Sequence, residues 1–499
     1  MIARAGGALL ERLASRRRRT LEHAWRAPAD VQEAALHRLV ACARDTEFGR
    51  AHDFVGIRSV ADYQARVPLR RYLDFRRYWQ RALQGVPDVT WPGRPRHWVK
   101  TSGTTAGDKL IPVTTDALAS HRQGGWDALF MAVERTGGAQ LLGGAMLFLG
   151  GTSQLTPIGD GALVGDLSGL AVRRLPPGLR GRYSPGPDIA AIPDWPTRLA
   201  RIAERVAGQD LRLLSGMPSW MLLVLEHVAR RRSLRACWPD LRVFIHGGVA
   251  FGPYRSAFEQ WLDRRLEYVE VYPASEGFVA VQTERTGGLS VMVDHGVFYE
   301  FVPLEELEAP RPRRLTVAEV ELGPAYAVVL TTPAGLWSYV LGDTVRFTGR
   351  DPLRLLITGR IRHFVNAFGE NVIVEEVERA LLGACAKAGG EVVEFTVAPR
   401  YPTTTEARGG HDWLVEFRVP PGDGPAFARA LDETLITLNT DYRTKRRADV
   451  GMLPPRLIVL PPGSFHHWLQ QRGKLGDQHK VPRVTNDRAV ADALLRNRG

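Results

Sequence analysis

The chain has 499 residues, a formal net charge of +12 and a pI of about 9.9. Hydrophobic residues make up 44% and charged residues 24% of the sequence, an ordinary globular composition that excludes a disordered or fibrous protein. At roughly 100–200 residues per domain, this length predicts at least two domains. Cys42, Cys237 and Cys385 share no metal-ligand spacing, which excludes a disulfide framework and a cysteine-built zinc site.

The first predicted element is a helix over residues 1–30, and it carries a basic run at residues 16–19. The segment lacks the apolar core and the cleavage site of a secretory signal, and we expect the basic run to lie on an exposed helix face. No apolar run reaches the ~18 residues that a membrane-spanning helix needs. These features predict a cytoplasmic protein with no membrane span.

Strands and helices alternate in the middle of the chain. Strands are predicted over residues 97–100, 211–214, 241–246 and 268–272, and a helix over 219–232. This alternation predicts an α/β layered domain. Ligands in such domains bind at the carboxyl ends of strands.

The pattern changes after residue 330. β structure is predicted over residues 337–347 and 355–358. The elements expected after it are a helix over 373–387, strands over 392–398 and 413–419, a helix over 425–439, a strand over 456–460 and a loop-rich tail. This block predicts a small α+β domain.

The loop after residue 100 consists of small and hydroxyl residues and ends in lysine: Thr101, Ser102, Gly103, Thr104, Thr105, Ala106, Gly107, Asp108 and Lys109. The two glycines let the backbone approach an anion, and hydroxyl and N–H groups can donate to phosphate oxygens. Lys109 adds a point charge that suits a polyphosphate. The spacing is not that of the P-loop, and a polar turn is the alternative.

A second polar segment ends the predicted strand 268–272: Tyr272, Pro273, Ala274, Ser275, Glu276 and Gly277. A carboxylate at such a position can hold Mg²⁺ that bridges phosphates, because Mg²⁺ binds one or two carboxylates together with phosphate oxygens. The alternative is a helix N-cap by Ser275 with Glu276 in the first turn. This segment alone favours neither interpretation.

Two more positions are candidates. Asp343, after Gly342, can accept two hydroxyl hydrogen bonds of the kind that a ribose diol offers, and a hairpin turn is the alternative. The tail at residues 473–483 holds Lys474 and Lys480, two of only six lysines in the chain. A lysine on such a loop can neutralise charge that develops on an α-phosphate, and a solvated tail is the alternative.

In this order and at these separations, the four segments resemble the Gretchen Hagen 3 family of acyl-acid amido synthetases, which belongs to the adenylate-forming superfamily. The family's three nucleotide motifs match residues 101–109, 272–276 and 339–343. Residues 215–220, 298–303, 438–442 and 480–483 are also similar. The chain departs from the motifs at Thr101, Ala274 and Val340, where the family has serine, serine and arginine.

The resemblance implies an α/β fold with two domains. A large N-terminal adenylate-forming domain with β-sheets and flanking helices, residues 1–360, would bind ATP and the acyl acid. A small mobile C-terminal α+β domain, residues 361–499, would follow after a hinge at residues 359–363. Residues 368–371 are similar to the loop that the superfamily uses in its second step.

The resemblance also implies an activity. The chain would adenylate a small carboxylic acid with ATP and Mg²⁺, release pyrophosphate, and join the acyl group to an amino acid or another amine with release of AMP. Lys480, Glu276 and Lys109 would be catalytic, and Glu276 would hold Mg²⁺. The ATP site would consist of Thr101, Ser102, Gly103, Thr104, Thr105, Gly107 and Lys109 at the phosphates, Gly247, Gly248, Val249 and Tyr272 at adenine, Asp343 at the ribose, and Pro273, Ala274, Ser275, Glu276 and Gly277 between them.

Three residues are candidates for substrate binding. Arg122 could pair with the acid's carboxylate, although a surface arginine is the alternative. Thr152 and Ser153 lie where a loop on the amino-acid side is expected. An acyl-CoA ligase and an adenylation-only enzyme are rival interpretations from the same superfamily. A nucleic-acid-binding protein is remote, because the arginines are dispersed and no nucleic-acid-binding signature occurs.

Overall fold

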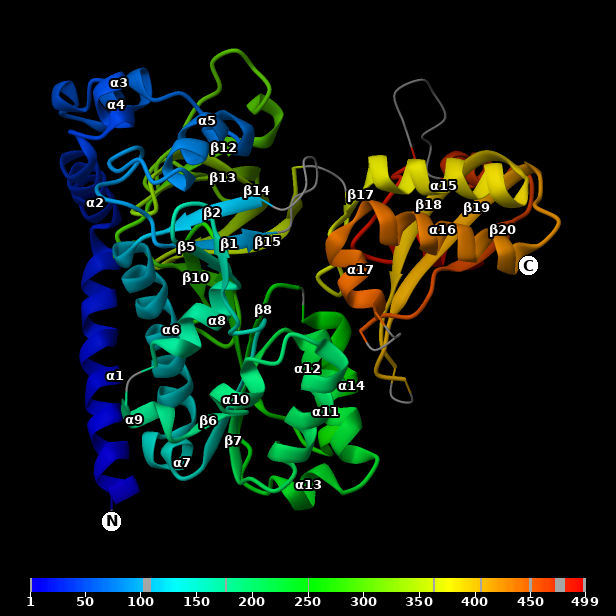
Figure 1. Cartoon of the computed structure of the whole chain (residues 1–499), viewed down its shortest axis with the longest axis horizontal. Coiled ribbons are helices and arrows are strands. Elements are labelled where there is room, and N and C mark those ends of the chain that lie inside the picture. Colours follow the sequence, from blue (N-terminus) through cyan, green and yellow to red (C-terminus); the bar gives the residue numbers. More distant parts are fainter. Residues whose placement is uncertain are drawn as a thin grey trace.

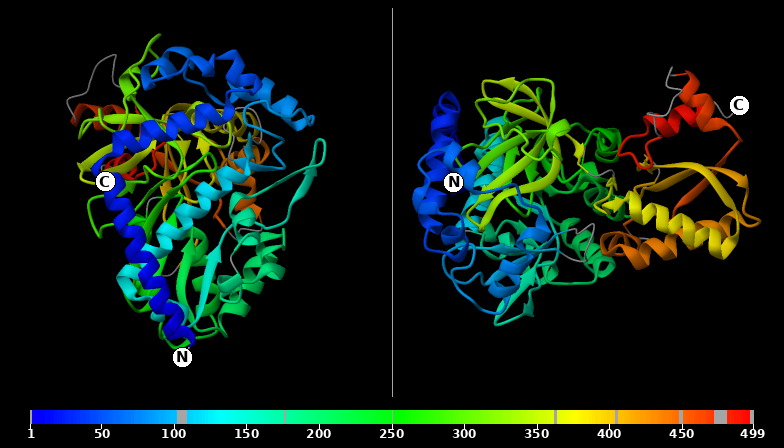
Figure 2. Two further views of the ribbon diagram at one scale, coloured as in Figure 1. Left: turned by 90° about the vertical axis from the view of Figure 1, so that its left-hand side faces the viewer. Right: turned by 90° about the horizontal axis from the view of Figure 1, so that it is seen from above.

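The computed structural model describes residues 2–101, 109–175, 177–249, 251–361, 364–403, 406–447, 451–471 and 481–496. Figure 1 shows a large α/β part, which carries the N-terminus, and a smaller part, which carries the C-terminus. The smaller part sits on one side of the larger part, as the view from above in Figure 2 shows. The fold class is therefore the predicted one.

The N-terminal segment forms two helices, α1 (Ile2–Arg26) and α2 (Pro28–Ala43), rather than one helix over residues 1–30. Pro28 explains the break: proline is accepted in the first turn of a helix but disfavours helical geometry in the residue before it. The prediction of an exposed basic run is wrong for Arg17. Its guanidinium pairs with Asp127 at 2.7 Å and with Asp294 at 2.5 Å, and so joins α1 to helix α6 (Thr115–Thr136).

An 11-stranded sheet forms the centre of the large part, in the order β12-β13-β14-β15-β11-β10-β9-β8-β7-β3-β6. Its strands are β3 (Ala145–Leu149), β6 (Tyr183–Ser184), β7 (Leu211–Gly216), β8 (Val243–Gly247), β9 (Glu267–Pro273), β10 (Phe278–Val281), β11 (Leu289–Val291), β12 (Phe298–Pro303), β13 (Ala325–Thr332), β14 (Leu336–Arg350) and β15 (Leu353–Arg360). β9 pairs parallel with β8 and antiparallel with β10. The sheet is thus parallel on one side of β9 and antiparallel on the other.

A four-stranded sheet, in the order β2-β1-β5-β4, lies beside the large sheet. It consists of β1 (His97–Thr101), β2 (Lys109–Val113), β4 (Thr156–Ile158) and β5 (Ala162–Gly165). The helices α3 (Glu47–Ala51), α4 (Val60–Arg66) and α5 (Tyr72–Leu83) share a hydrophobic core with this sheet. Trp98 of β1, Trp79 of α5 and Trp337 of β14 belong to one hydrophobic core that joins these elements.

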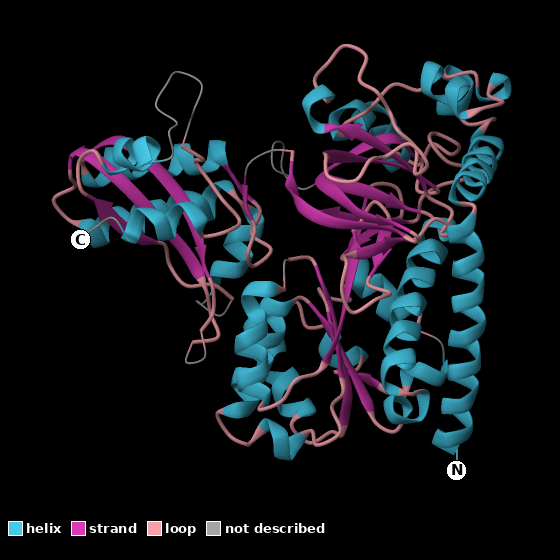
Figure 3. Ribbon diagram, turned by 180° about the vertical axis from the view of Figure 1, so that it is seen from behind, coloured by secondary structure: helices cyan, strands magenta, loops and turns pink. Residues whose placement is uncertain are grey.

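Helices cover both faces of the parallel half of the large sheet (Figure 3). On one face lie α1, α6 and α7 (Gly138–Leu142). On the other lie α11 (Trp195–Val206), α12 (Pro218–Ala229), α13 (Leu234–Cys237) and α14 (Arg255–Leu262). Helix α11 buries Leu199, Ile202, Ala203 and Val206, whose spacing places them on one helical face. The short helices α8 (Leu167–Arg173), α9 (Pro177–Arg180) and α10 (Pro187–Ala190) connect β5 to this layer.

The smaller part is built on a three-stranded sheet of β18 (Glu391–Arg400), β19 (Gly410–Val419) and β20 (Arg456–Leu460). Before it come the two-stranded sheet of β16 (Phe364–Val365) and β17 (Val372–Ile373) and helix α15 (Val374–Ala388). Helices α15 and α16 (Gly424–Leu438) share one core with this sheet, and α17 (Thr440–Arg446) follows α16. The predicted loop-rich tail is wrong in part, because α18 (Ser464–Gln471) and α19 (Ala489–Arg496) pack their apolar faces on the sheet.

Several contacts between described residues join the two parts, among them an ion pair of Arg447 with Asp194 at 3.2 Å. The Tyr254 hydroxyl donates to the carbonyl oxygen of Ala367, and its ring packs edge-on against Tyr401 at 5.6 Å between centroids. The ammonium of Lys445, on α17, lies 4.2 Å from the centre of the Trp220 ring on α12. In the described ranges, no helix is long and apolar enough to cross a membrane.

Candidate active site

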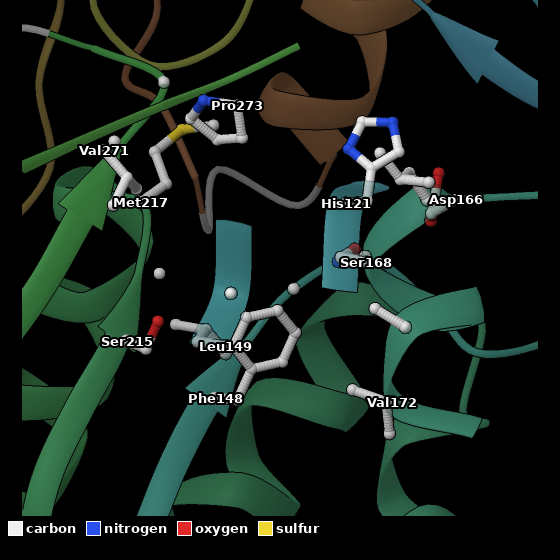
Figure 4. Close-up of a pocket in the computed structure, with 18 of the residues that line it drawn as sticks. His121, Phe148, Leu149, Asp166, Ser168, Val172, Ser215, Met217, Val271 and Pro273 are labelled. Atoms are coloured by element: carbon white, nitrogen blue, oxygen red, sulfur yellow. The ribbon is translucent and has the colours of Figure 1, made fainter. Parts of the chain in front are cut away.

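The carboxyl ends of the parallel strands meet at one edge of the large sheet and line a cavity of about 970 Å³. Residues that follow β3, β7, β8 and β9 all reach it, as expected for an α/β sheet. Its apolar wall includes Phe148, Leu149 and Val172, which Figure 4 shows around an open centre. From the smaller part, α17 adds Thr440, Asp441, Thr444 and Lys445.

The second and third predicted motifs meet through a direct hydrogen bond. The hydroxyl of Tyr272, at the end of β9, donates to Asp343 on β14 at 2.7 Å. The other carboxylate oxygen of Asp343 accepts from Arg360 at 2.6 Å. The Asp343 carboxylate therefore has a protein partner on each oxygen, and Tyr272 lies in the core rather than on the wall of the cavity.

The alternative of a hairpin turn at Asp343 is wrong. Gly342 and Asp343 lie inside the single long strand β14, and Asp343 stands opposite Arg360 in the β14–β15 ladder. Gly342 has a φ of +99°, a conformation that glycine adopts without strain. The strand therefore changes direction locally and continues.

Glu276 is a buried carboxylate with an exposed fraction of 7%. Burial raises its pKa, its own backbone amide and the charge of Lys109 oppose that rise, and Asp343 adds to it. The Tyr339 hydroxyl makes a long contact of 3.5 Å to its Oε1. Because Glu276 follows β9 in an irregular segment with no helix, the alternative of a helix first turn is wrong.

The first motif is described only at its two ends. Thr101 ends β1, Lys109 begins β2, and the two residues are paired in the antiparallel ladder. Thr101 lines the cavity, whereas the Lys109 ammonium lies 5.6 Å from the centre of the Tyr72 ring. Ser102, Gly103, Thr104, Thr105 and Gly107 lie outside the described residues, as do Lys474 and Lys480 of the tail.

The predicted adenine wall follows β8. Gly247 and Gly248 line the cavity, together with Pro273, Ala274 and Ser275, whereas Val249 and Gly277 do not line it. A Cβ on Gly247 would lie 2.4 Å from the carbonyl oxygen of Val271, so only glycine lets the two backbones approach this closely.

The three predicted substrate residues separate into two groups. Arg122, on α6, and Thr152, after β3, both line the cavity. Ser153 is buried outside it, and its N–H donates to the carbonyl oxygen of Ala190 at 2.9 Å.

Sequence reasoning missed several charged or titratable residues of the cavity, among them His121, Asp166, Arg198 and Lys445. His121 interacts with the Ser275 backbone, and burial lowers its pKa to about 4, so its imidazole is neutral at pH 7. Lys445 could have been noticed as one of six lysines. The others carry no local motif, because only the fold brings their segments together.

No group of three or more His, Cys, Asp or Glu side chains suited to a metal ion occurs within the described ranges. A cation at Glu276 would therefore need ligands beyond the carboxylates of the described residues. Mg²⁺ bound to phosphates fits this condition, because it keeps few protein ligands.

Comparisons with known proteins agree with this geometry. The family models for the GH3 N-terminal, central and C-terminal domains match residues 17–199, 290–360 and 375–489. The chain is 27% identical over 276 residues to the indole-3-acetic acid-amido synthetase GH3.3 of Arabidopsis thaliana, covering 52% of this chain and 46% of that protein. It is 28% identical over 214 residues to GH3.8 of Oryza sativa subsp. indica, covering 40% and 35%. The matched region thus spans about half or less of these relatives.

Solved structures share the fold. A GH3.15 acyl acid amido synthetase matches with a TM-score of 0.59 at 18% identity, covering 94% of this chain and 93% of that one. A 2-hydroxyisobutyryl-CoA ligase in complex with an acyl-AMP and CoA matches with a TM-score of 0.54 at 18% identity, covering 94% and 92%. The three domain models occur in one order along the chain, and together they match most of it. The chain belongs to the GH3 family.

Proposed function

We propose that this protein is an ATP-dependent acyl-acid amido synthetase. In the first step a carboxylate oxygen attacks the α-phosphorus of ATP, which forms acyl-AMP and releases pyrophosphate. In the second step an amine attacks the acyl carbon, which gives the amide, AMP and a proton. The names of the matched relatives support this chemistry, since they are indole-3-acetic acid-amido synthetases.

The observation that carries the proposal is one cavity shared by the nucleotide motifs and an apolar chamber. Thr101, Gly248 and Ser275, from the first motif, the β8 end and the second motif, line the same space as Phe148 and Leu149. An acid with an apolar body and a nucleotide can therefore meet there. Positioning of the two reactants is the main requirement for such a displacement.

The residues of the nucleotide end fit ATP and Mg²⁺. Gly247 and Gly248 line the cavity at the end of β8, where the base would lie. Asp343 retains acceptor capacity for ribose hydroxyls beyond its two protein partners, because a carboxylate has about four lone-pair sites. Glu276 would bind Mg²⁺ as the carboxylate, and Mg²⁺ would neutralise phosphate charge.

We further propose that the chain has domains over residues 1–360 and 361–499, with a hinge at residues 359–363, and that Lys480 acts on the α-phosphate. Arg122 would pair with the acid's carboxylate, and Thr152 would line the path of the amine. We place the enzyme in the cytoplasm, with ATP, a carboxylic acid and an amino acid or another amine as its partners.

The experiment is a matrix of carboxylic acids, indole-3-acetic acid among them, against amino acids, other amines and CoA. ATP–pyrophosphate exchange reports the first step, and product mass with AMP release reports the second. We expect acid-dependent exchange and amide formation, and loss of one or both activities in Lys480→Ala. Faster AMP release with CoA than with every amine would instead identify an acyl-CoA ligase.

A further inference from the structure

His121 is a polar side chain of the cavity that belongs to none of the sequence motifs. It lies on α6, and its ring is one of those around the open centre of the cavity (Figure 4). Most of the cavity wall is apolar, and its members include Leu118, Trp126, Leu129, Phe148 and Ile245. A polar group on such a wall needs a hydrogen-bond partner, because burial without one is costly.

Close packing brings α6 to the segment that joins β9 to β10. Gly124 lies about one turn beyond His121, and a Cβ at this position would lie 2.3 Å from the Phe278 ring. Only glycine therefore lets Phe278, at the start of β10, pack directly on the helix. This approach places His121 beside Ser275 of the second motif.

The Ser275 backbone determines which nitrogen of His121 carries the proton. Burial lowers the pKa of His121 to about 4, so the ring is neutral at pH 7. The hydrogen bond with the Ser275 backbone opposes this change, which identifies the carbonyl oxygen as the partner, because an acceptor favours the protonated ring. One nitrogen of the neutral ring therefore donates to Ser275, and the other carries a lone pair.

The second nitrogen of His121 is an acceptor to which no residue in the described ranges donates. The Nδ1 atom of His295 is also without a partner among these residues, but protein atoms enclose it. No atom of His121 is both enclosed and unpartnered, so its acceptor nitrogen is open to the cavity that the residue lines. A ligand in the cavity can therefore reach this nitrogen.

The chemistry of a lone pair restricts which ligand group can bind it. A carboxylate is repelled by the lone pair, and Arg122, the next residue of α6, is the proposed partner of that group. A hydroxyl or an N–H group donates a hydrogen bond and satisfies the nitrogen. The acid must then carry this donor on its body, apart from its carboxylate.

We propose that His121 accepts a hydrogen bond from a hydroxyl or N–H group on the body of the carboxylic acid, so that acids with such a donor are the preferred substrates. This inference rests on the proposed function. A hydrocarbon acid of the same shape would cover the nitrogen and leave it unpaired, which costs binding free energy. An ether oxygen in the donor's place would bring two acceptors together. His121 thus determines specificity in the first step.

The test measures ATP–pyrophosphate exchange with matched acids. Phenylacetic acid is compared with its ortho-, meta- and para-hydroxy and methoxy derivatives, which carry a donor or only an acceptor around one ring. Indole-3-acetic acid is compared with its benzothiophene analogue, in which sulfur replaces the N–H group. In at least one pair, the donor should raise kcat/KM about 10–100-fold over the acid that lacks it, the range for an acceptor left unpaired.

Variants of His121 separate this residue from the rest of the wall. In His121→Phe the preference for a donor should disappear, and exchange with phenylacetic acid should remain, which shows that the variant is folded. His121→Gln keeps an acceptor and should restore part of the preference. Ser120→Ala is the matched control, because it removes a buried, unpartnered hydroxyl of the same helix that does not line the cavity. This control should keep the wild-type preference.

Three outcomes overturn the inference and leave the proposed function in place. In the first, no acid with a donor exceeds its methoxy, unsubstituted or sulfur counterpart. In the second, His121→Phe keeps the preference for a donor. In the third, His121→Phe raises the KM for ATP equally with every acid, which assigns the residue to the nucleotide. Absence of exchange with every acid would instead overturn the proposed function, and the inference with it.

Discussion

Two charged regions of the large part differ in how their charges are balanced. At the nucleotide motifs, Asp343 is held by Tyr272 and Arg360, and Glu276 lies among Tyr339 and Lys109. At the cavity residue Arg198, the side chain is as deeply buried, it forms no ion pair with any described residue, and its Nε has no hydrogen-bond partner among them. A paired site is pre-organised for its ligand, whereas an unpaired one depends on the ligand for its balance. The predictions below test this difference.

The largest effect is expected at the nucleotide motifs. Glu276→Gln should reduce pyrophosphate exchange and amide formation together by about 10²–10³-fold, the range for loss of one electrostatic stabiliser in an active site. Rates of both steps at saturating acid provide the measurement. Glu270→Gln is the matched control, because burial also raises the pKa of Glu270, which lies within strand β9 and not in the segment that follows it. Equal losses in both variants would remove Glu276 from the site.

Folding stability, measured without substrates, should also distinguish the paired charge of Arg360 from the unpaired charge of Arg198. Arg360→Met leaves Asp343 without its cation and should lower the free energy of unfolding by about 2 kcal/mol. Arg198→Met removes an unpaired charge and should instead raise it by about 1 kcal/mol. Denaturant titration of both variants measures the difference. A similar destabilisation by both substitutions would contradict the contrast between paired and unpaired charges.

The fall of the pyrophosphate exchange rate at low pH should depend on the Mg²⁺ concentration. Burial raises the pKa of Glu276, so protonation already competes with the cation at a pH above the ordinary glutamate range, near 4.3. As the pH falls through the raised pKa, the KM for Mg·ATP should rise. A higher Mg²⁺ concentration should shift this fall to lower pH, because only the ionised carboxylate binds the cation. If the low-pH fall of the exchange rate does not change with the Mg²⁺ concentration, a group other than Glu276 causes it.

The smallest effect is expected from the ring beneath Lys445. Trp220→Leu removes a cation–π contact worth about 0.5–1 kcal/mol, so the free energy of unfolding should fall by about that amount. Trp220→Phe keeps a ring and should lie nearer the wild type. Denaturant titration measures both variants. Equal losses in the two variants would contradict a contribution from the contact between the ring and Lys445.

Contiguous segments made much of the fold and of the nucleotide motifs predictable. The apolar runs before Gly247 and Ser275 indicated β8 and β9, and β20 (Arg456–Leu460) has the predicted bounds. Tertiary pairing overruled local pattern elsewhere. The arginine at position 17 is neutralised by carboxylates from distant segments, which no helical pattern reveals.

The shared environment of Asp166, Arg198 and Lys445 was not predictable for the same reason. Asp166, Arg198 and Lys445 each stand in unremarkable local sequence, and only the meeting of β5, α11 and α17 at one cavity gives them a shared environment. Tyr272 is a different case. Its motif was recognised from the sequence, but its burial beside Asp343 was not, because that contact depends on strand β14.

The β14–β15 ladder restricts where this protein can gain or lose residues. Thr344 stands opposite Gly359 and Val345 opposite Ile357, so Thr358 is an extra residue in β15. Side chains alternate between the two faces of a sheet, so a strand that is shortened or lengthened by one residue presents the opposite set. The one residue that β15 can lose here without this effect is Thr358, because its deletion closes the bulge and leaves Arg360 opposite Asp343.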